Sequence, residues 1–298
     1  MGTPEFAVAS LEALHNSRHQ VVAVVTAPDK PQGRGLQLTP SAVKSCAVEH
    51  QIPVLQPEKL KSEEFQATLK RFNADLIVVV AFRMLPESVW SMPPLGTINL
   101  HASLLPKYRG AAPINWAIIN GETETGITTF KLQQEIDTGN ILFCETEPIH
   151  PEDDAGSLYE RLMIKGADLI VKTTDALAEG TATEIPQPAI AGELPKAPKI
   201  FKETCLIEWN NTTQSCLNHI RGLSPYPGAW CQLNGKTFKI FKAIHSSSKK
   251  EAEAGAIETN QKDSLEIRCN DGWLKLLEIQ PEGKKRMRIE EFFRGNQI

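Results

Sequence analysis

The fold of this chain is decided by the stretch Asp75-Leu76-Ile77-Val78-Val79-Val80-Ala81-Phe82. An apolar run of this length, rich in β-branched residues, predicts a strand that is buried on both faces, as in a parallel sheet. Helical patterns occur at 41–50 and 63–72, and further apolar runs occur at 21–26 and 97–102. Because helix and strand alternate, residues 1–132 are predicted to form βαβ units on a parallel-rich, Rossmann-like α/β sheet.

The first residues predict a helix with no strand before it. Thr3, Pro4 and Glu5 supply an N-cap, a first-turn proline and an acidic residue at the positive end of the helix dipole. A βαβ pattern requires a strand in front of Gly2, so we expect the first strand to be missing from this chain. Nothing near Gly2 completes a Gly-x-Gly-x-x-Gly turn, which disfavours a dinucleotide site.

Composition changes after Gly180, because four prolines fall between residues 181 and 199 with little periodicity. This predicts an extended linker at 183–200. The linker would separate a first domain at 1–182 from a second domain at 201–298.

The second domain has the pattern of a small β-structure. One helical and five strand patterns occur, the helix at 213–223 and the strands at 205–209, 229–233, 237–244, 264–269 and 273–279. Asn234-Gly235 and Asp271-Gly272 are two-residue hairpin signals between strands. Short strands with one helix predict a partly open OB-like β-barrel, a scaffold that often holds oligonucleotides.

Composition is that of an ordinary globular protein: 298 residues, 41% hydrophobic and 23% charged. No apolar run is long enough to span a membrane, and no secretory signal begins the chain, so we expect a cytoplasmic protein with no membrane partner. The six cysteines include no Cys-x-x-Cys pair, which argues against a zinc site and a disulfide framework. Residues 201–298 carry 15 Lys and Arg against 12 Asp and Glu, a small excess that suits a polyanion or a solvated surface.

Two polar residues end the apolar run at 97–102. Asn99 and His101 are two positions apart, so on a strand their side chains point to one face, where an amide and an imidazole could act on one reacting atom. A histidine at a strand end is a hydrogen-bonded core residue about as often as it is a functional residue. Asp137 follows the next predicted strand, at 128–132, and could join them only if the fold brings it near His101.

The polar pair belongs to a larger set of motifs. Together they resemble the signature of the folate-dependent formyltransferases: Asn99-x-His101, Ser103-Leu104-Leu105-Pro106-x-x-Arg109-Gly110-x-x-Pro113 and Asp137-Thr138-Gly139. Two further motifs and the OB-like second domain resemble the branch that acts on tRNA: Gly2-Thr3-Pro4-Glu5-Phe6-Ala7 and Pro28-Asp29-x-Pro31-x-Gly33-Arg34-Gly35. The resemblance covers essentially the whole chain.

The resemblance implies that a formyl group passes from 10-formyltetrahydrofolate to the α-amino group of methionyl initiator tRNA, with the protein acting as a monomer. Asn99 and His101 would donate hydrogen bonds to the formyl oxygen as negative charge develops on it. Asp137 would orient and charge His101 and help to relay the proton lost by the amine. Because hydrogen bonds would polarise the carbonyl, we expect no metal in this reaction.

The resemblance also implies binding residues. Folate contacts are expected in the loop of Ser103, Leu104, Leu105 and Pro106, and around Phe82, Arg83, Met84 and Leu85. Many relatives have Tyr-Gly where this chain has Phe82-Arg83. Contacts to tRNA are expected from Lys30 and Arg34, and from Lys284, Lys285 and Arg286. The loop after Arg34 has fewer basic residues than in the family, which predicts a weaker and less salt-sensitive contact.

Other functions remain open on the sequence alone. An enzyme of the same superfamily could formylate a sugar-nucleotide amine, and one that releases formate from the same folate is a further possibility. The glycinamide ribonucleotide branch is disfavoured because it lacks a second domain. An RNA-binding module with an inactive first domain is disfavoured because Asn99, His101 and Asp137 are all present.

Overall fold

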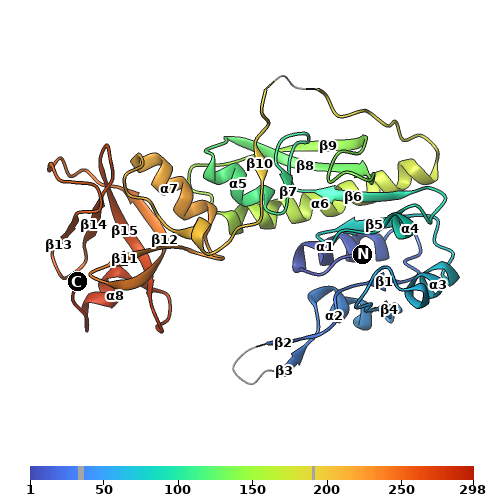
Figure 1. Ribbon diagram of the computed structural model, residues 1–298, viewed down its shortest axis with the longest axis horizontal. Helices are drawn as coiled ribbons and strands as arrows, with labels where there is room; N and C mark the ends of the chain where they lie inside the picture. The colour runs from blue at the N-terminus through green and yellow to red at the C-terminus, as the bar shows by residue number, and fades with distance from the viewer. Residues whose placement is uncertain (33–36, 190–191) are drawn as a thin grey trace. The chain divides into compact units, whose positions relative to one another are not determined.

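The computed structural model describes residues 1–32, 37–189 and 192–298 (Figure 1). The chain divides into two compact units. The first unit comprises Met1–Gly110, Gly126–Glu147 and Tyr159–Pro195, and the second comprises Ala111–Thr125, Pro148–Leu158 and Lys196–Ile298.

Parallel strand pairs form the centre of the first unit. β1 (Val24–Val25) pairs in parallel with β4 (Val54–Leu55). A second sheet has the order β5-β6-β8-β9, with bounds Ile77–Val80, Thr97–His101, Glu124–Lys131 and Ile141–Pro148. β5 and β6 are parallel, which confirms the predicted parallel sheet, whereas β8 runs antiparallel to β6.

The helices of the first unit are α1 (Glu5–His15), α2 (Ala42–Glu49), α3 (Glu63–Arg71), α4 (Glu87–Trp90) and α6 (Ala155–Ala178), the last of which starts in the second unit. Three of them, α1, α2 and α3, were predicted from the sequence, whereas α4 and α6 were not. Ser41 and Ser62 cap α2 and α3 by accepting backbone N–H groups, as N-cap hydroxyls do. The predicted cap at Thr3 is wrong: Pro4 occupies the N-cap position of α1 and makes no side-chain cap bond. A short hairpin of β2 (Lys30–Gln32) and β3 (Gln37–Thr39) was not predicted.

Packing of α6 fixes which face of β6 is available to a ligand. A Cβ on Gly166 would lie 2.7 Å from a methyl of Leu100, so the helix approaches that side of the strand closely. The Thr129 and Thr173 hydroxyls lie 2.9 Å apart and join α6 to β8. Because side chains alternate along a strand, Asn99 and His101 project to the face opposite Leu100.

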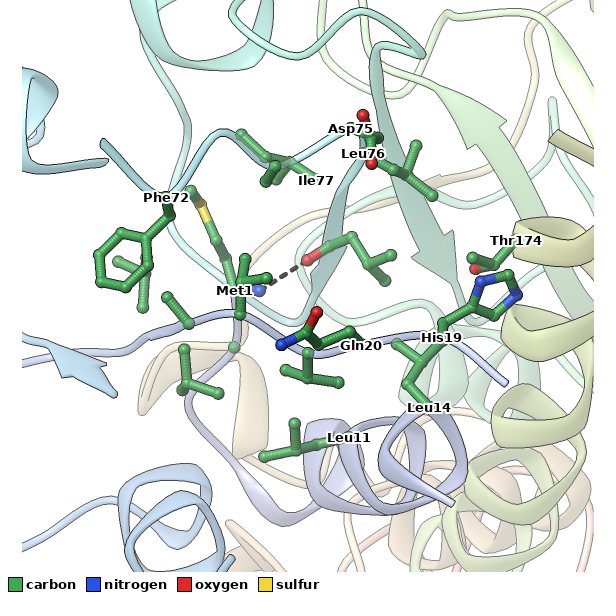
Figure 2. Close-up of a pocket in the computed structure, with 18 of the residues that line it drawn as sticks. Met1, Leu11, Leu14, His19, Gln20, Phe72, Asp75, Leu76, Ile77 and Thr174 are labelled. Carbon is green, nitrogen blue, oxygen red and sulfur yellow. Dashed lines mark hydrogen bonds between the residues drawn. The ribbon is translucent and has the colours of Figure 1, made fainter. Parts of the chain in front are cut away.

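Met1 and Gly2 lie between β5 and β1. The Met1 amine donates to the Val78 carbonyl at 2.6 Å, and the Gly2 N–H donates to the Val25 carbonyl at 3.1 Å. A cavity of about 540 Å³ opens beside Met1, lined mainly by apolar side chains of the two strands and of neighbouring helices (Figure 2). Burial lowers the pKa of the Met1 amine to about 5. The cavity thus lies beside the two residues that join β5 to β1.

The second unit is built on an antiparallel sheet. Its strand order is β11-β12-β15-β14-β13, with β16 on β15, and the bounds in chain order are Ala229–Leu233, Lys236–His245, Ile257–Thr259, Leu265–Arg268, Trp273–Pro281 and Met287–Arg288. Its helices are α5 (Pro113–Ile119), η1 (Glu203–Cys205), α7 (Thr213–Gly222) and α8 (Ile289–Phe293). Two further strands are two residues each: β7 (Arg109–Gly110) belongs to the first unit and β10 (Lys196–Ala197) to the second.

Most of the strand predictions for this unit are confirmed. Asn234 and Gly235 have φ of 49° and 75°, the positive values that a tight hairpin between β11 and β12 requires. The predicted strand at 205–209 is wrong, because η1 ends at Cys205 and a single bridge from Leu206 to Trp230 follows. Hydrogen bonding among the described strands ends at β11 and β13, so it establishes an antiparallel sheet but no closed barrel. No helix in the described part of the chain is long and apolar enough to cross a membrane.

Candidate active site

The structure brings His101 and Asp137 together at the end of β6. His101 Nδ1 lies 3.9 Å from Asp137 Oδ2, and the two side chains are only 7% and 12% exposed. At this distance the groups attract each other without sharing a hydrogen bond. The same Asp137 oxygen instead accepts the backbone N–H of Gly110 at 2.9 Å.

The opposite ring nitrogen of His101 is fixed by the backbone. His101 Nε2 lies 2.9 Å from the carbonyl oxygen of Tyr108, a residue with a φ of 59°. A carbonyl oxygen can only accept, so Nε2 carries the proton of this hydrogen bond. Nδ1 is therefore the nitrogen that faces Asp137.

Asn99 lies two residues before His101 on the same face of β6. It is partly buried, opposite Phe130 of β8 and Val79 of β5. Its side-chain amide makes no hydrogen bond to the residues that the structure describes. The two amide hydrogens are thus available to an acceptor that approaches this face.

The loop that carries Asp137 has a tightly constrained backbone. Asp137 has a φ of 55°, in the left-handed region. A Cβ at Gly139 would lie 1.6 Å from the carbonyl oxygen of Lys131, so no larger residue fits here without displacement of the loop. The Asp-Thr-Gly motif therefore combines a carboxylate with the glycine that its turn requires.

Sequence analysis missed a residue that holds this loop. Gln187 Nε2 donates to the carbonyl oxygens of Asp137 at 2.7 Å and Gly139 at 2.9 Å. Its side-chain oxygen accepts from the Arg109 guanidinium, with Nε at 3.1 Å. Gln187 falls in the proline-rich segment interpreted as a linker, where no pattern marked it. The bridge between Ile141 and Ile185 anchors this segment to β9.

The predicted folate loop is held by a hydrogen bond of its own and by contacts with β8. Ser103 is fully buried and its hydroxyl donates to the Lys107 carbonyl, while Leu105 packs in a core cluster with Phe130. Pro106 is also buried, and Leu104 is half-buried. A ligand would therefore meet the backbone and shape of this loop more than the side chains of Ser103 and Leu105.

The second predicted folate segment follows β5. Arg83 is exposed and its guanidinium donates to the carbonyl of Glu58 at 2.8 Å and to that of Pro57. Met84 is 69% exposed, whereas Leu85 is buried and Phe82 is half-buried in the same apolar cluster. Only part of this segment is accessible to a ligand through its side chains.

The candidate tRNA contacts fall into three groups. Lys30 is exposed on β2, and Arg34 lies outside the described residues. Lys284 and Lys285 are exposed in the turn between β15 and β16. Arg286 is paired with Glu278 at 2.5 Å and lies 4.5 Å from the Phe241 ring, so its charge is partly neutralised.

Family models match both parts of the chain. The model described as "Formyl transferase" matches residues 1–174, and "Formyl transferase, C-terminal domain" matches residues 199–297. A methionyl-tRNA formyltransferase of Bacteroides fragilis is 51% identical over 302 residues, covering 99% of this chain and 93% of the relative. One of Parabacteroides distasonis is 52% identical over 304 residues, covering 99% and 94%.

Solved structures share the fold at low identity. An N-formyltransferase of Helicobacter canadensis, in complex with folinic acid and dTDP-3-aminofucose, superposes with a TM-score of 0.66 at 21% identity, covering 96% of this chain and 97% of its own. HypX of Aquifex aeolicus, in complex with tetrahydrofolic acid, has a TM-score of 0.62 at 19% identity, covering 84% and 44%. At these identities the structures support the fold alone.

Proposed function

This chain belongs to the formyl transferase family, and from that premise we propose that it transfers a formyl group from 10-formyltetrahydrofolate to the α-amino group of methionyl initiator tRNA. The product is N-formylmethionyl-tRNA, the form used to start translation. The observation that carries the proposal is the approach of Asp137 to His101, which shares a face of β6 with Asn99, in a chain about half identical to methionyl-tRNA formyltransferases over nearly its full length.

The reaction is a group transfer in which atoms balance without a redox step. The unprotonated amine forms a bond to the formyl carbon, and the bond from that carbon to N10 of the folate breaks. One proton leaves the new amide nitrogen and one is gained at N10. A tetrahedral intermediate with a negative oxygen lies between the two steps, so stabilising that oxygen lowers the barrier.

Asn99 and His101 supply the donors for that oxygen. They project from the same face of β6, and the Asn99 amide is free of other described partners. Because Nε2 of His101 is held by the Tyr108 carbonyl, the proton offered to the substrate is carried by Nδ1. An imidazolium donor stabilises an oxyanion more strongly than a neutral one, since the hydrogen bond is charge-assisted.

Asp137 orients His101 and stabilises positive charge on its ring. Its carboxylate faces His101 Nδ1 at 3.9 Å, a distance at which opposite charges attract each other. The 3.9 Å separation leaves no direct hydrogen bond to break when a substrate oxygen approaches Nδ1. A water between amine and carboxylate would carry away the proton that the amine loses.

Binding of the two substrates is assigned to separate surfaces. The folate lies against the backbone of Ser103, Leu104, Leu105 and Pro106 and against Phe82, Arg83, Met84 and Leu85. The tRNA contacts Lys30 and Arg34, and it contacts Lys284, Lys285 and Arg286 on the second unit, which we propose to be an OB-like domain. The protein acts as a monomer in the cytoplasm, and the reaction needs no metal.

The decisive experiment offers purified protein and 10-formyltetrahydrofolate one amine at a time. We expect formylation of methionyl initiator tRNA, detected by acid-gel or mass analysis of the aminoacyl end, and none of uncharged tRNA. Formylation of an amino sugar nucleotide in place of the tRNA would establish the alternative function in this superfamily. Release of formate with neither acceptor would indicate a hydrolase.

A further inference from the structure

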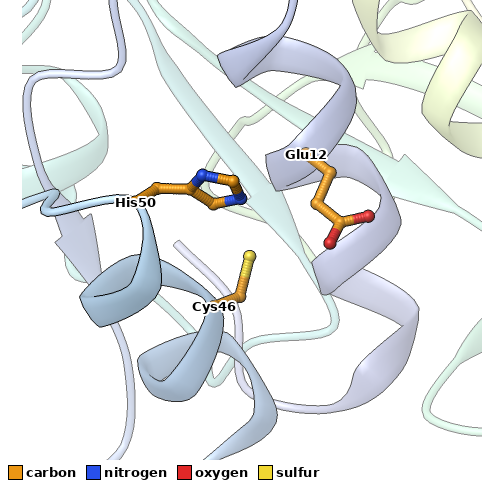
Figure 3. Close-up of side chains that lie close together, drawn as sticks. All are labelled: Glu12, Cys46 and His50. Atoms are coloured by element: carbon orange, nitrogen blue, oxygen red, sulfur yellow. The ribbon is translucent and has the colours of Figure 1, made fainter.

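A cluster of metal-binding residue types lies between α1 and α2, in the first unit. Glu12 projects from α1, while Cys46 and His50 project from α2, four residues and about one turn apart (Figure 3). One carboxylate oxygen, the thiol sulfur and one imidazole nitrogen all lie within 4.8 Å of one another. None of the three belongs to the motifs that the proposed function uses.

A further residue of a metal-binding type, His15, lies next to the cluster. It lies one turn after Glu12 on α1, and its ring centroid is 4.2 Å from that of His50. Among the described residues, the side chains of Glu12, His15 and His50 make no hydrogen bond or ion pair that would have to be broken. Glu12 from α1 thus meets Cys46 and His50 from α2, and His15 of α1 lies beside His50.

The environment favours a cation with an affinity for sulfur. Cys46 is buried, and its sulfur lies within 4.8 Å of a carboxylate oxygen of Glu12 and an imidazole nitrogen of His50. Thiolate, imidazole and carboxylate are the donors that Zn²⁺ accepts in tetrahedral geometry.

We propose that Glu12, His15, Cys46 and His50 form a binding site for Zn²⁺ that clasps α1 to α2. On binding, the Cys46 thiol releases its proton to solvent as the sulfur–zinc bond forms, and small rotations of the side chains close the four donors around the ion. The site is structural and lies outside the formyl-transfer residues. Sequence analysis excluded zinc for want of a Cys-x-x-Cys pair, whereas the tertiary structure assembles the donors from two helices.

The test uses Co²⁺ as a spectroscopic probe on the full chain after dialysis against a chelator. We expect one equivalent of Co²⁺ to produce a thiolate charge-transfer band in the near ultraviolet and visible bands typical of tetrahedral cobalt. Added Zn²⁺ should abolish the charge-transfer band and the visible bands, because it displaces Co²⁺ from the site. Absence of the charge-transfer band in the parent protein would overturn the proposal.

Matched variants locate the site. Cys46→Ser should remove the charge-transfer band. Glu12 and His15 are exposed, so Glu12→Gln and His15→Gln should each weaken Co²⁺ binding by about 10-fold or more without unfolding the chain. Cys144→Ser, at an exposed thiol, and Glu49→Gln, at a neighbouring carboxylate, are the controls and should retain the band. A band that survives Cys46→Ser, or disappears with Cys144→Ser, would place the metal elsewhere.

Discussion

His101 Nδ1 faces Asp137 Oδ2 at 3.9 Å, while Nε2 of the same ring is held at 2.9 Å by the Tyr108 carbonyl. The imidazole is thus fixed on one side and open to a ligand on the other. A ring in this arrangement can keep its orientation while the proton on Nδ1 is offered to a substrate.

The first prediction concerns His101→Ala. If Nδ1–H stabilises the formyl oxyanion, turnover should fall by at least about 100-fold, toward background, while folate binding is largely retained. Single-turnover formylation and equilibrium folate binding separate the two effects. His245→Ala, at an exposed histidine of the second unit, is the control. Turnover of the His101 variant within a few-fold of the parent would refute the donor role.

The second prediction concerns Gln187, which holds the Asp137 and Gly139 carbonyls. Gln187→Ala should lower kcat by about 10-fold to 100-fold through misplacement of Asp137, because small displacements of a catalytic group are costly. KM for the folate should change by less than a few-fold. Gln66→Ala, on α3, serves as the matched control. An unchanged kcat would mean that the loop keeps its position without Gln187.

The third prediction concerns Gly139→Ala. A Cβ 1.6 Å from the Lys131 carbonyl must displace the loop, so the variant should lose about 1–3 kcal/mol of unfolding free energy, together with activity. Gly295→Ala, where an added Cβ meets nothing within 4 Å, is the control and should melt as the parent does. Chemical denaturation of both variants measures the difference.

The fourth prediction concerns Arg34, which lies outside the described residues. Arg34→Gln should raise the apparent KM for tRNA and reduce its dependence on salt, because one phosphate contact is lost. KM measured across a salt series, with Arg71→Gln of α3 as the control, checks this. If KM and its salt slope match the parent throughout, the loop does not contact the tRNA.

The fifth prediction concerns the cavity beside Met1. The folded-state pKa of the Met1 amine is lowered to about 5 from 8.0, so the unfolded chain binds a proton there that the folded chain does not. The loss of unfolding free energy from this difference reaches its full size below about pH 5 and disappears as the pH rises to 8. A short β-branched apolar extension before Met1 would remove the buried charge and fill the cavity with a strand.

Thermal unfolding of two extended chains at pH 5.5 and 8 separates the effect of the buried Met1 charge from the effect of the cavity. The apolar extension and a Gly-Ser extension of equal length should both weaken the pH dependence, since each moves the amine out of the protein. Only the apolar extension should raise Tm at pH 8, where the charge no longer matters and only burial differs. Equal Tm values for the two extensions at pH 8 would show that the cavity does not accept a strand.

The sequence predicted the elements whose patterns are local. The apolar run around β5, the helices α2 and α3 and the Asn234-Gly235 hairpin were all predicted, because burial, helical periodicity and turn geometry act over a few residues. The strand predicted at 205–209 failed because a strand exists only when a partner pairs with it, and there Leu206 makes a single bridge.

The sequence by itself determined the parallel sheet, the shared face of Asn99 and His101 and the motifs that mark the family. Only the tertiary structure decided that Asp137 faces His101, that Gln187 holds the Asp137 loop and that Cys46 and His50 approach Glu12. The physical reason is the range of the interactions. Periodicity records what each segment buries, whereas a contact between residues 36 or 50 positions apart depends on how separate segments pack, which no local pattern encodes.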